Sequence, residues 1–199
     1  MAIKAVDVVL LPSEQMEDKA IKANRELLKQ CPNKIVLDKK NCLPHISLAM
    51  GCIDEGNIAD IEKSLEAVAK QYSLPELNVI GPHTETNSAG EKVTALQIER
   101  TDLLQSLHEH IMHKLVPYIS YDVKADMLFS SSDVNKSTLL WIKNYPDESS
   151  FENFFPHITL GYGQISNFSF PAKFSVSKLA LCHLGNHCTC REILVSVKL

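Results

Sequence analysis

Apolar residues recur at helical spacing in three segments of the chain. The clearest pattern is Ile58, Ile61, Leu65 and Val68, which follow one another at intervals of three and four and form one apolar face. Sparser apolar positions in the first segment predict a surface helix with a single buried stripe. The three predicted helices span 13–30, 58–72 and 101–116.

Short β-branched and apolar runs bounded by turn residues predict strands. The first, AVDVVLL, ends at Pro12. A polar turn at 86–90, loops at 130–132 and 144–147, and a turn at Gly185-Asn186 separate later runs. The predicted strands span 5–11, 77–80, 93–98, 137–142, 174–181 and 193–199.

One short pattern occurs twice. The chain reads PHISLAMG at Pro44–Gly51 and PHITLGYG at Pro156–Gly163. In each half a strand leads to a helix, and the helix is followed by the motif. No linker rich in Gly, Pro or Ser separates the halves. We therefore expect one domain over 1–199, made of two similar lobes.

Each motif has the alternation of a strand. His45 and Ser47 share one face, while Ile46 and Leu48 share the other and are expected to face a core. The second motif places His157 and Thr159 in the same way. If a pseudo-two-fold axis relates the lobes, the motif strands can lie side by side, and two imidazoles and two hydroxyls converge.

Such a group of side chains suits phosphodiester chemistry. A neutral imidazole can take a proton from an attacking water or hydroxyl, and a protonated one can give a proton to the leaving oxygen, because the ordinary histidine pKa is near 6.5. Hydroxyls can donate to the phosphoryl oxygens as charge builds there. This chemistry needs no metal and no cofactor.

The doubled His-x-(Ser/Thr)-hydrophobic pattern resembles the 2H phosphoesterase superfamily, which includes 2′-5′ RNA ligase-like proteins and cyclic nucleotide phosphodiesterases. The resemblance implies an α+β fold, with two lobes related by a pseudo-two-fold axis, antiparallel sheets around a central cleft and helices outside. It implies His45 and His157 as the acid/base pair, and Ser47 and Thr159 as phosphoryl ligands. The implied substrates are 2′,3′-cyclic phosphates and small 2′-5′-linked phosphodiesters.

The chain departs from the family after the second motif. Many relatives carry a basic residue where this chain has Gly161-Tyr162-Gly163. Tyr162 is a candidate substrate-binding residue, through stacking on a base or through its hydroxyl. A nucleotide- or RNA-binding module with little turnover, and a 2′-5′ RNA ligase, are the alternative functions.

Charge and composition restrict the partners. The formal net charge is −4, and only Arg25, Arg100 and Arg191 are arginines among 20 basic residues. This disfavours binding along a duplex and favours a small nucleotide or an RNA-end phosphodiester. No segment reaches the length of a membrane span, and six cysteines without an export signal predict reduced thiols. We expect a cytoplasmic monomer.

Two other clusters attract attention. The segment Cys182–Cys190 holds five possible zinc ligands, but its spacing lacks a Cys-x₂-Cys pair, and a hairpin turn explains it without metal. His108, His110 and His113 fall in the third predicted helix, and we expect them on its solvated side.

Overall fold

The computed structural model describes residues 2–32, 34–87, 90–165 and 168–199. The predicted turn at 86–90 includes Ser88 and Ala89, which lie outside the described residues. The α-helices are α1 Glu14–Leu28, α2 Ile58–Ala69, α3 Asp102–Leu115 and α4 Lys136–Glu148. The strands are β1 Ile3–Pro12, β2 Ile46–Asp54, β3 Leu77–Thr86, β4 Lys92–Ile98, β5 Ile119–Ser120, β6 His157–Tyr162, β7 Lys173–Phe174, β8 Val176–Leu184 and β9 Cys190–Lys198. Short 3₁₀ turns are η1 Glu55–Asn57, η2 Ala125–Met127, η3 Phe151–Asn153 and η4 Asn186–Cys188.

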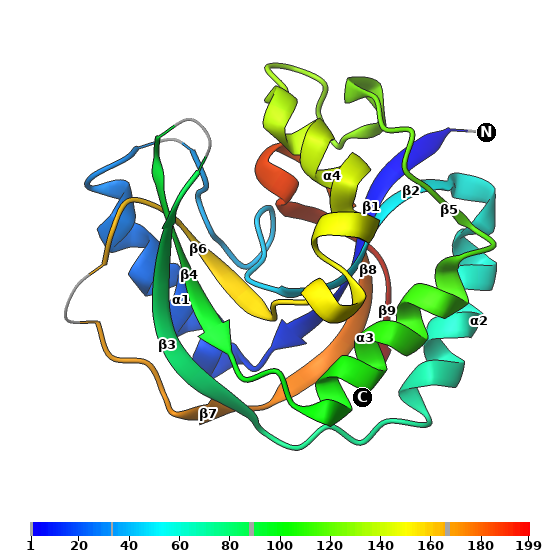
Figure 1. The fold of residues 1–199 in the computed structure, drawn as a ribbon, viewed down its shortest axis with the longest axis horizontal. Coiled ribbons are helices and arrows are strands. Elements are labelled where there is room, and N and C mark those ends of the chain that lie inside the picture. Colours follow the sequence, from blue (N-terminus) through cyan, green and yellow to red (C-terminus); the bar gives the residue numbers. More distant parts are fainter. Residues whose placement is uncertain (1, 33, 88–89, 166–167) are drawn as a thin grey trace.

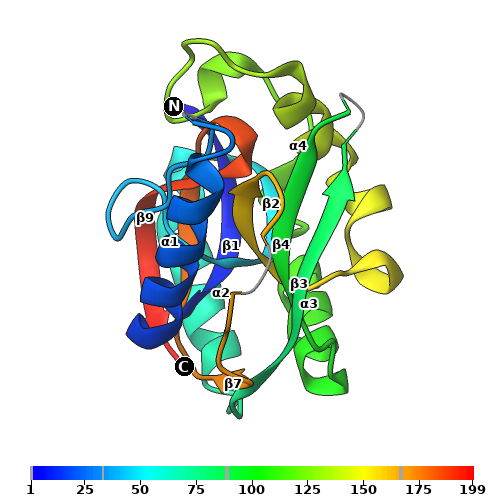
Figure 2. The same cartoon turned by 90° about the vertical axis from the view of Figure 1, so that its left-hand side faces the viewer.

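The strands of the described residues form two sheets. One has five strands in the order β5-β2-β1-β8-β9, and the other has four in the order β6-β4-β3-β7. Neighbouring strands are antiparallel in both. Figures 1 and 2 show the two sheets side by side from two directions, with the helices around them. The expected α+β class with antiparallel sheets is confirmed.

The helix of each half of the chain packs against the motif strand of the other half. The first half contributes β1, α1 and β2, and the second contributes β4, α3 and β6. Helix α1 packs against β6, and α3 packs against β2 (Figure 1). Each motif strand is therefore supported from behind by the helix of the other half.

The motif strands bury the apolar residues that the alternation predicted. Ile46, Leu48, Ile158 and Leu160 are all fully buried. Burial of a side chain of this size contributes about 1.5–3 kcal/mol. The residues on the opposite face of each motif, which carry the imidazoles and hydroxyls, are only half-buried.

The segment 137–142 is not a strand, and the predicted loop at 144–147 is also wrong. Both belong to α4. Asn135 caps the helix, since its side chain accepts a hydrogen bond from the N–H of Ser137 over 3.0 Å. Thr138, Ile142 and Tyr145 are buried at intervals of four and three, which is a helical stripe. Pro146 falls in the last turn.

The histidines of α3 do not all face solvent as expected. His108 is fully buried, whereas His113 is exposed and His110 is intermediate. In the described part of the chain, no helix is long and apolar enough to span a membrane.

Candidate active site

The two motif histidines are held in the same way. His45 immediately precedes β2, and His157 opens β6. The Nδ1 atom of each ring lies within hydrogen-bond distance of the carbonyl oxygen two residues earlier, at 2.7 Å from Leu43 and 2.8 Å from Phe155. A carbonyl oxygen only accepts, so Nδ1 carries the proton in both rings. Nε2 is left as the atom that can exchange a proton with a substrate.

Each motif strand carries a β-bulge at the same motif position. The register of β1 with β2 skips Leu48, and that of β4 with β6 skips Leu160. A bulge turns the strand locally and re-aims the side chains beside it. In both motifs it directly follows the hydroxyl residue, Ser47 or Thr159.

A buried polar side chain from the opposite helix holds the carbonyl of each bulged leucine. The Nδ1–H of His108 in α3 donates to the oxygen of Leu48 over 2.6 Å, and the amide of Asn24 in α1 donates to the oxygen of Leu160 over 2.8 Å. The N–H of Phe151 donates to His108 Nε2 over 2.8 Å. His108 is therefore a neutral structural residue, and burial lowers its pKa.

Burial also keeps the catalytic candidates neutral. It lowers the pKa of His45 to about 4, partly offset by the bond to Leu43, and a charge on His157 would lower it further. The pKa of His157 is lowered by burial too, although the charge of Glu85 raises it. The two motif strands, β2 and β6, contact each other. An anion bound between the two rings would raise both pKa values.

A carboxyl group from outside both motifs lies beneath the first motif. Asp7, in β1, is fully buried and accepts a hydrogen bond from Ser47 Oγ over 2.6 Å. Its Oδ2 lies 3.9 Å from His45 Nε2. Burial raises the pKa of Asp7 to about 8, partly offset by Ser47 and by the N–H of Ala49. The available signal was a single acid within an apolar run, AVDVVLL.

The second hydroxyl is free of such a partner. Thr159 makes no side-chain hydrogen bond to any other described residue. The two hydroxyls therefore differ, since one is engaged with a buried carboxyl and the other is available to a ligand.

An exposed aromatic ring lies beside His157. Phe155 is 39% exposed, and its ring centroid lies 5.5 Å from that of His157 and 5.9 Å from that of His83. Gln97 pairs with His157 across β4 and β6, so the two side chains share a face of the sheet. A surface hollow is lined by Phe155, Gln97 and Arg100, among others. The sequence offered Phe155 only as an aromatic residue beside the motif.

Tyr162 lies at the far end of β6. Its ring is 9% exposed, with the Lys34 ammonium 4.4 Å from the centroid. Its hydroxyl oxygen lies 3.1 Å from Nδ1 of His187, in η4. Lys34 also forms an ion pair with Glu91. Tyr162 thus contacts two basic side chains, His187 through its hydroxyl and Lys34 through its ring, and the ring is nearly covered.

Comparison with known proteins bears on the fold. No protein-family model matches the sequence, and no curated protein matches it. The structure of E. coli LigT complexed with phosphate matches with a TM-score of 0.52 at 14% identity, covering 100% of this chain and 99% of that chain. LigT complexed with ATP matches with a TM-score of 0.50 at 13% identity, over 100% and 99% of the two chains.

The chain has the fold of LigT. LigT is a 2H phosphoesterase, so the fold implied by the repeated motif is confirmed. At this identity the likeness to LigT concerns the fold alone.

Proposed function

We propose that this protein is a 2H-type phosphodiesterase that works without a metal ion. Its substrates are 2′,3′-cyclic phosphates or small 2′-5′-linked nucleotide phosphodiesters. The observation that carries the proposal is the matched arrangement of His45 and His157. Both rings are oriented by an Nδ1–H donated to the carbonyl two residues earlier, and both leave Nε2 free for proton transfer.

The two rings divide the proton transfers of hydrolysis. One Nε2 takes a proton from water as the water oxygen bonds to phosphorus. The other ring, protonated, gives its Nε2 proton to the ribose oxygen as the bond from that oxygen to phosphorus breaks. The phosphodiester becomes a phosphomonoester, and the histidine pair ends with its original number of protons. Each transfer of this kind contributes roughly 10²–10⁴-fold in rate.

The motif hydroxyls bind the phosphoryl group. Thr159 has its hydroxyl available for a non-bridging oxygen. Ser47 can do the same when Asp7 is protonated, because a neutral carboxyl can donate its own proton to Ser47 Oγ and free the serine O–H. Such donors stabilise the charge that builds on the phosphoryl oxygens.

The nucleoside lies against the aromatic side of the site. Phe155 offers an exposed ring beside His157, and the same residue lines the adjoining hollow. Stacking of a base on an aromatic ring contributes about 1–3 kcal/mol. Tyr162 takes part in substrate binding through its hydroxyl and through the two side chains that it contacts, His187 and Lys34. The complexes of LigT with phosphate and with ATP are in line with a small nucleotide ligand.

Monomeric state and cytoplasmic location remain predictions. All six cysteines lie in the described residues, and none of them is in a disulfide.

A substrate panel tests the proposed function. The wild-type protein is incubated with 2′,3′-cyclic mononucleotides, a 2′-5′ dinucleotide, its 3′-5′ isomer and 3′,5′-cyclic AMP, with and without EDTA. We expect turnover of at least one of the first two classes and no loss of activity in EDTA. Binding without turnover would instead favour a nucleotide-binding module. Activity that EDTA abolishes and zinc restores would contradict the metal-free mechanism.

A further inference from the structure

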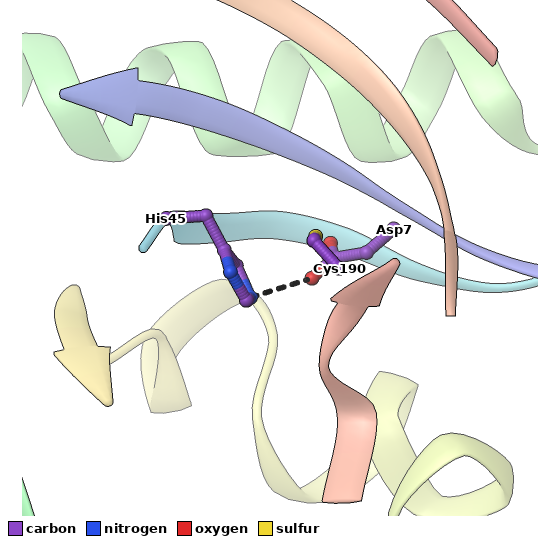
Figure 3. Close-up of side chains that lie close together, drawn as sticks. All are labelled: Asp7, His45 and Cys190. Atoms are coloured by element: carbon purple, nitrogen blue, oxygen red, sulfur yellow. Dashed lines mark ion pairs between the residues drawn. The ribbon is translucent and has the colours of Figure 1, made fainter. Parts of the chain in front are cut away.

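Three side chains from separate parts of the sequence meet beneath the first motif. Asp7 comes from β1, His45 precedes β2, and Cys190 opens β9. Their ligand atoms, a carboxylate oxygen, an imidazole nitrogen and the thiol sulfur, all lie within 4.8 Å of one another. Figure 3 shows the three side chains converging, with the His45–Asp7 contact dashed.

Two of the three side chains are already oriented by a neighbour, and the backbone of the third is tied to the site. The Nδ1–H of His45 donates to Leu43, which leaves the Nε2 lone pair toward Asp7. Ser47 holds Oδ2 of Asp7. The N–H of Leu43 donates to the carbonyl of Cys190 over 3.0 Å, which ties the His45 segment to the Cys190 backbone. Metal-binding residues are characteristically fixed by such outer contacts.

One buried polar atom in the cluster lacks a partner. Among the described residues, Oδ1 of Asp7 has no hydrogen bond of good geometry, although the residue is fully buried. An unsatisfied buried oxygen costs free energy and needs an explanation. The oxygen that lies 3.9 Å from His45 Nε2 is Oδ2, and a cation bound by both carboxylate oxygens of Asp7 would satisfy Oδ1 as well.

We propose that Asp7, His45 and Cys190 form a binding site for one zinc ion. Zinc favours tetrahedral sets of thiolate, imidazole and carboxylate ligands, at about 2.0–2.3 Å, and can keep a fourth position for water. The present spacing needs only a small contraction to reach that geometry. The His45 side chain is 13% exposed while Asp7 is fully buried, so the ion enters past the imidazole. Binding releases the thiol proton of Cys190 and any proton on Asp7.

Zinc at this site would affect catalysis, an inference that rests on the proposed function. His45 Nε2 cannot bind zinc and transfer a proton at the same time. Zinc therefore acts as a reversible inhibitor of the phosphodiesterase, and a chelator preserves or raises activity.

Metal titration of the full-length reduced protein tests the site directly. Cobalt(II) is the probe, because a cobalt–thiolate bond gives a near-ultraviolet charge-transfer band. We expect one equivalent to produce this band and zinc to displace it. Cys190→Ser and Asp7→Asn should each weaken binding by at least the roughly 10–100-fold that loss of an outer contact costs. The control Cys52→Ala removes another buried thiol and should leave binding unchanged.

X-ray absorption of the wild-type zinc complex covers the case in which a variant fails to fold. We expect one sulfur and otherwise nitrogen or oxygen ligands. Absence of stoichiometric binding, two or more sulfur ligands, or binding unchanged in both variants would overturn the site.

The inhibition step is measured separately. Zinc should inhibit wild-type turnover with a midpoint equal to its dissociation constant, and Cys190→Ser should shift that midpoint to higher zinc. Zinc binding without any phosphodiesterase activity would uphold the site and remove the proposed function. Phosphodiesterase activity without zinc binding would do the reverse.

Discussion

His108 in α3 donates its Nδ1–H to the carbonyl oxygen of Leu48 over 2.6 Å, at the bulge that directly follows Ser47. Asn24 in α1 makes the equivalent bond to Leu160 in the other motif. Each bulge is thus fixed by a helix of the opposite half. The spatial relation of the two motifs therefore depends on two buried polar side chains outside the motifs.

Replacement of His108 should destabilise the fold. His108→Phe keeps a ring stacked on Phe154 but leaves the Leu48 carbonyl and the Phe151 N–H without partners. Each buried unsatisfied group costs about 1–3 kcal/mol. Urea unfolding should show a loss of that order or up to twice it. His113→Phe, at an exposed position of the same helix, is the control, and equal stability of both variants would refute this account of His108.

The same residue predicts a pH dependence of stability. Burial lowers the pKa of His108 in the folded state from its ordinary 6.5. The unfolded state then binds the proton more tightly, so stability is complete above about pH 6.5 and falls as the pH drops below it. The free energy of unfolding should decline less between pH 7 and 5 in His108→Phe than in the wild type. An identical decline of the unfolding free energy in both proteins would show that His108 does not cause this pH dependence.

Gly161 offers a test of the Asn24 contact. It has φ +137°, and a Cβ there would lie 2.9 Å from the Asn24 amide nitrogen. Gly81 has φ +147° and nothing within 4 Å of such a Cβ. Both alanine variants carry backbone strain, but only Gly161→Ala displaces Asn24 from Leu160. Gly161→Ala should be the less stable in urea and the slower in kcat, and a larger effect at Gly81 would contradict this assignment.

Removal of the two motif hydroxyls should affect stability and catalysis differently. Thr159→Val removes a phosphoryl donor and should lower kcat with little change in unfolding. Ser47→Ala should lower kcat and also destabilise, because it leaves the buried Asp7 without its hydroxyl partner. Loss of one such donor costs at most about 3–4 kcal/mol in the barrier. Unchanged kcat in both variants would mean that the hydroxyls only brace the strands.

The sequence was sufficient for the features that depend on local alternation. The repeated motif, its buried Ile and Leu pairs and the strand–helix–strand order of each half followed from the pattern of apolar positions. The sequence of segment 136–148 does not predict its helix, because β-branched and aromatic residues and Pro146 outweigh a buried stripe of only three positions. Packing against β2 and η4 stabilises the helix there despite the strand propensity of its residues.

Long-range relations could not be derived from the sequence. His108 was expected in solvent because the apolar stripe of α3 appeared complete without it, whereas the carbonyl of a bulge on another strand draws it inside. The meeting of Asp7, His45 and Cys190 brings together β1, the segment before β2 and the start of β9, which are far apart in the sequence. The Cys182–Cys190 segment drew attention to zinc, but the ligands that accompany Cys190 lie elsewhere in the chain.

The most direct test of the central claim is the turnover of a 2′,3′-cyclic mononucleotide by the wild type, His45→Ala, His157→Ala and the double variant. Folding of each is checked by urea unfolding. Each single variant should lose about 10²–10⁴ in rate, because each removes one proton transfer. The double variant should be little worse than either single one, since members of one catalytic unit are not additive. Near-wild-type turnover by either folded single variant would contradict the two-histidine mechanism.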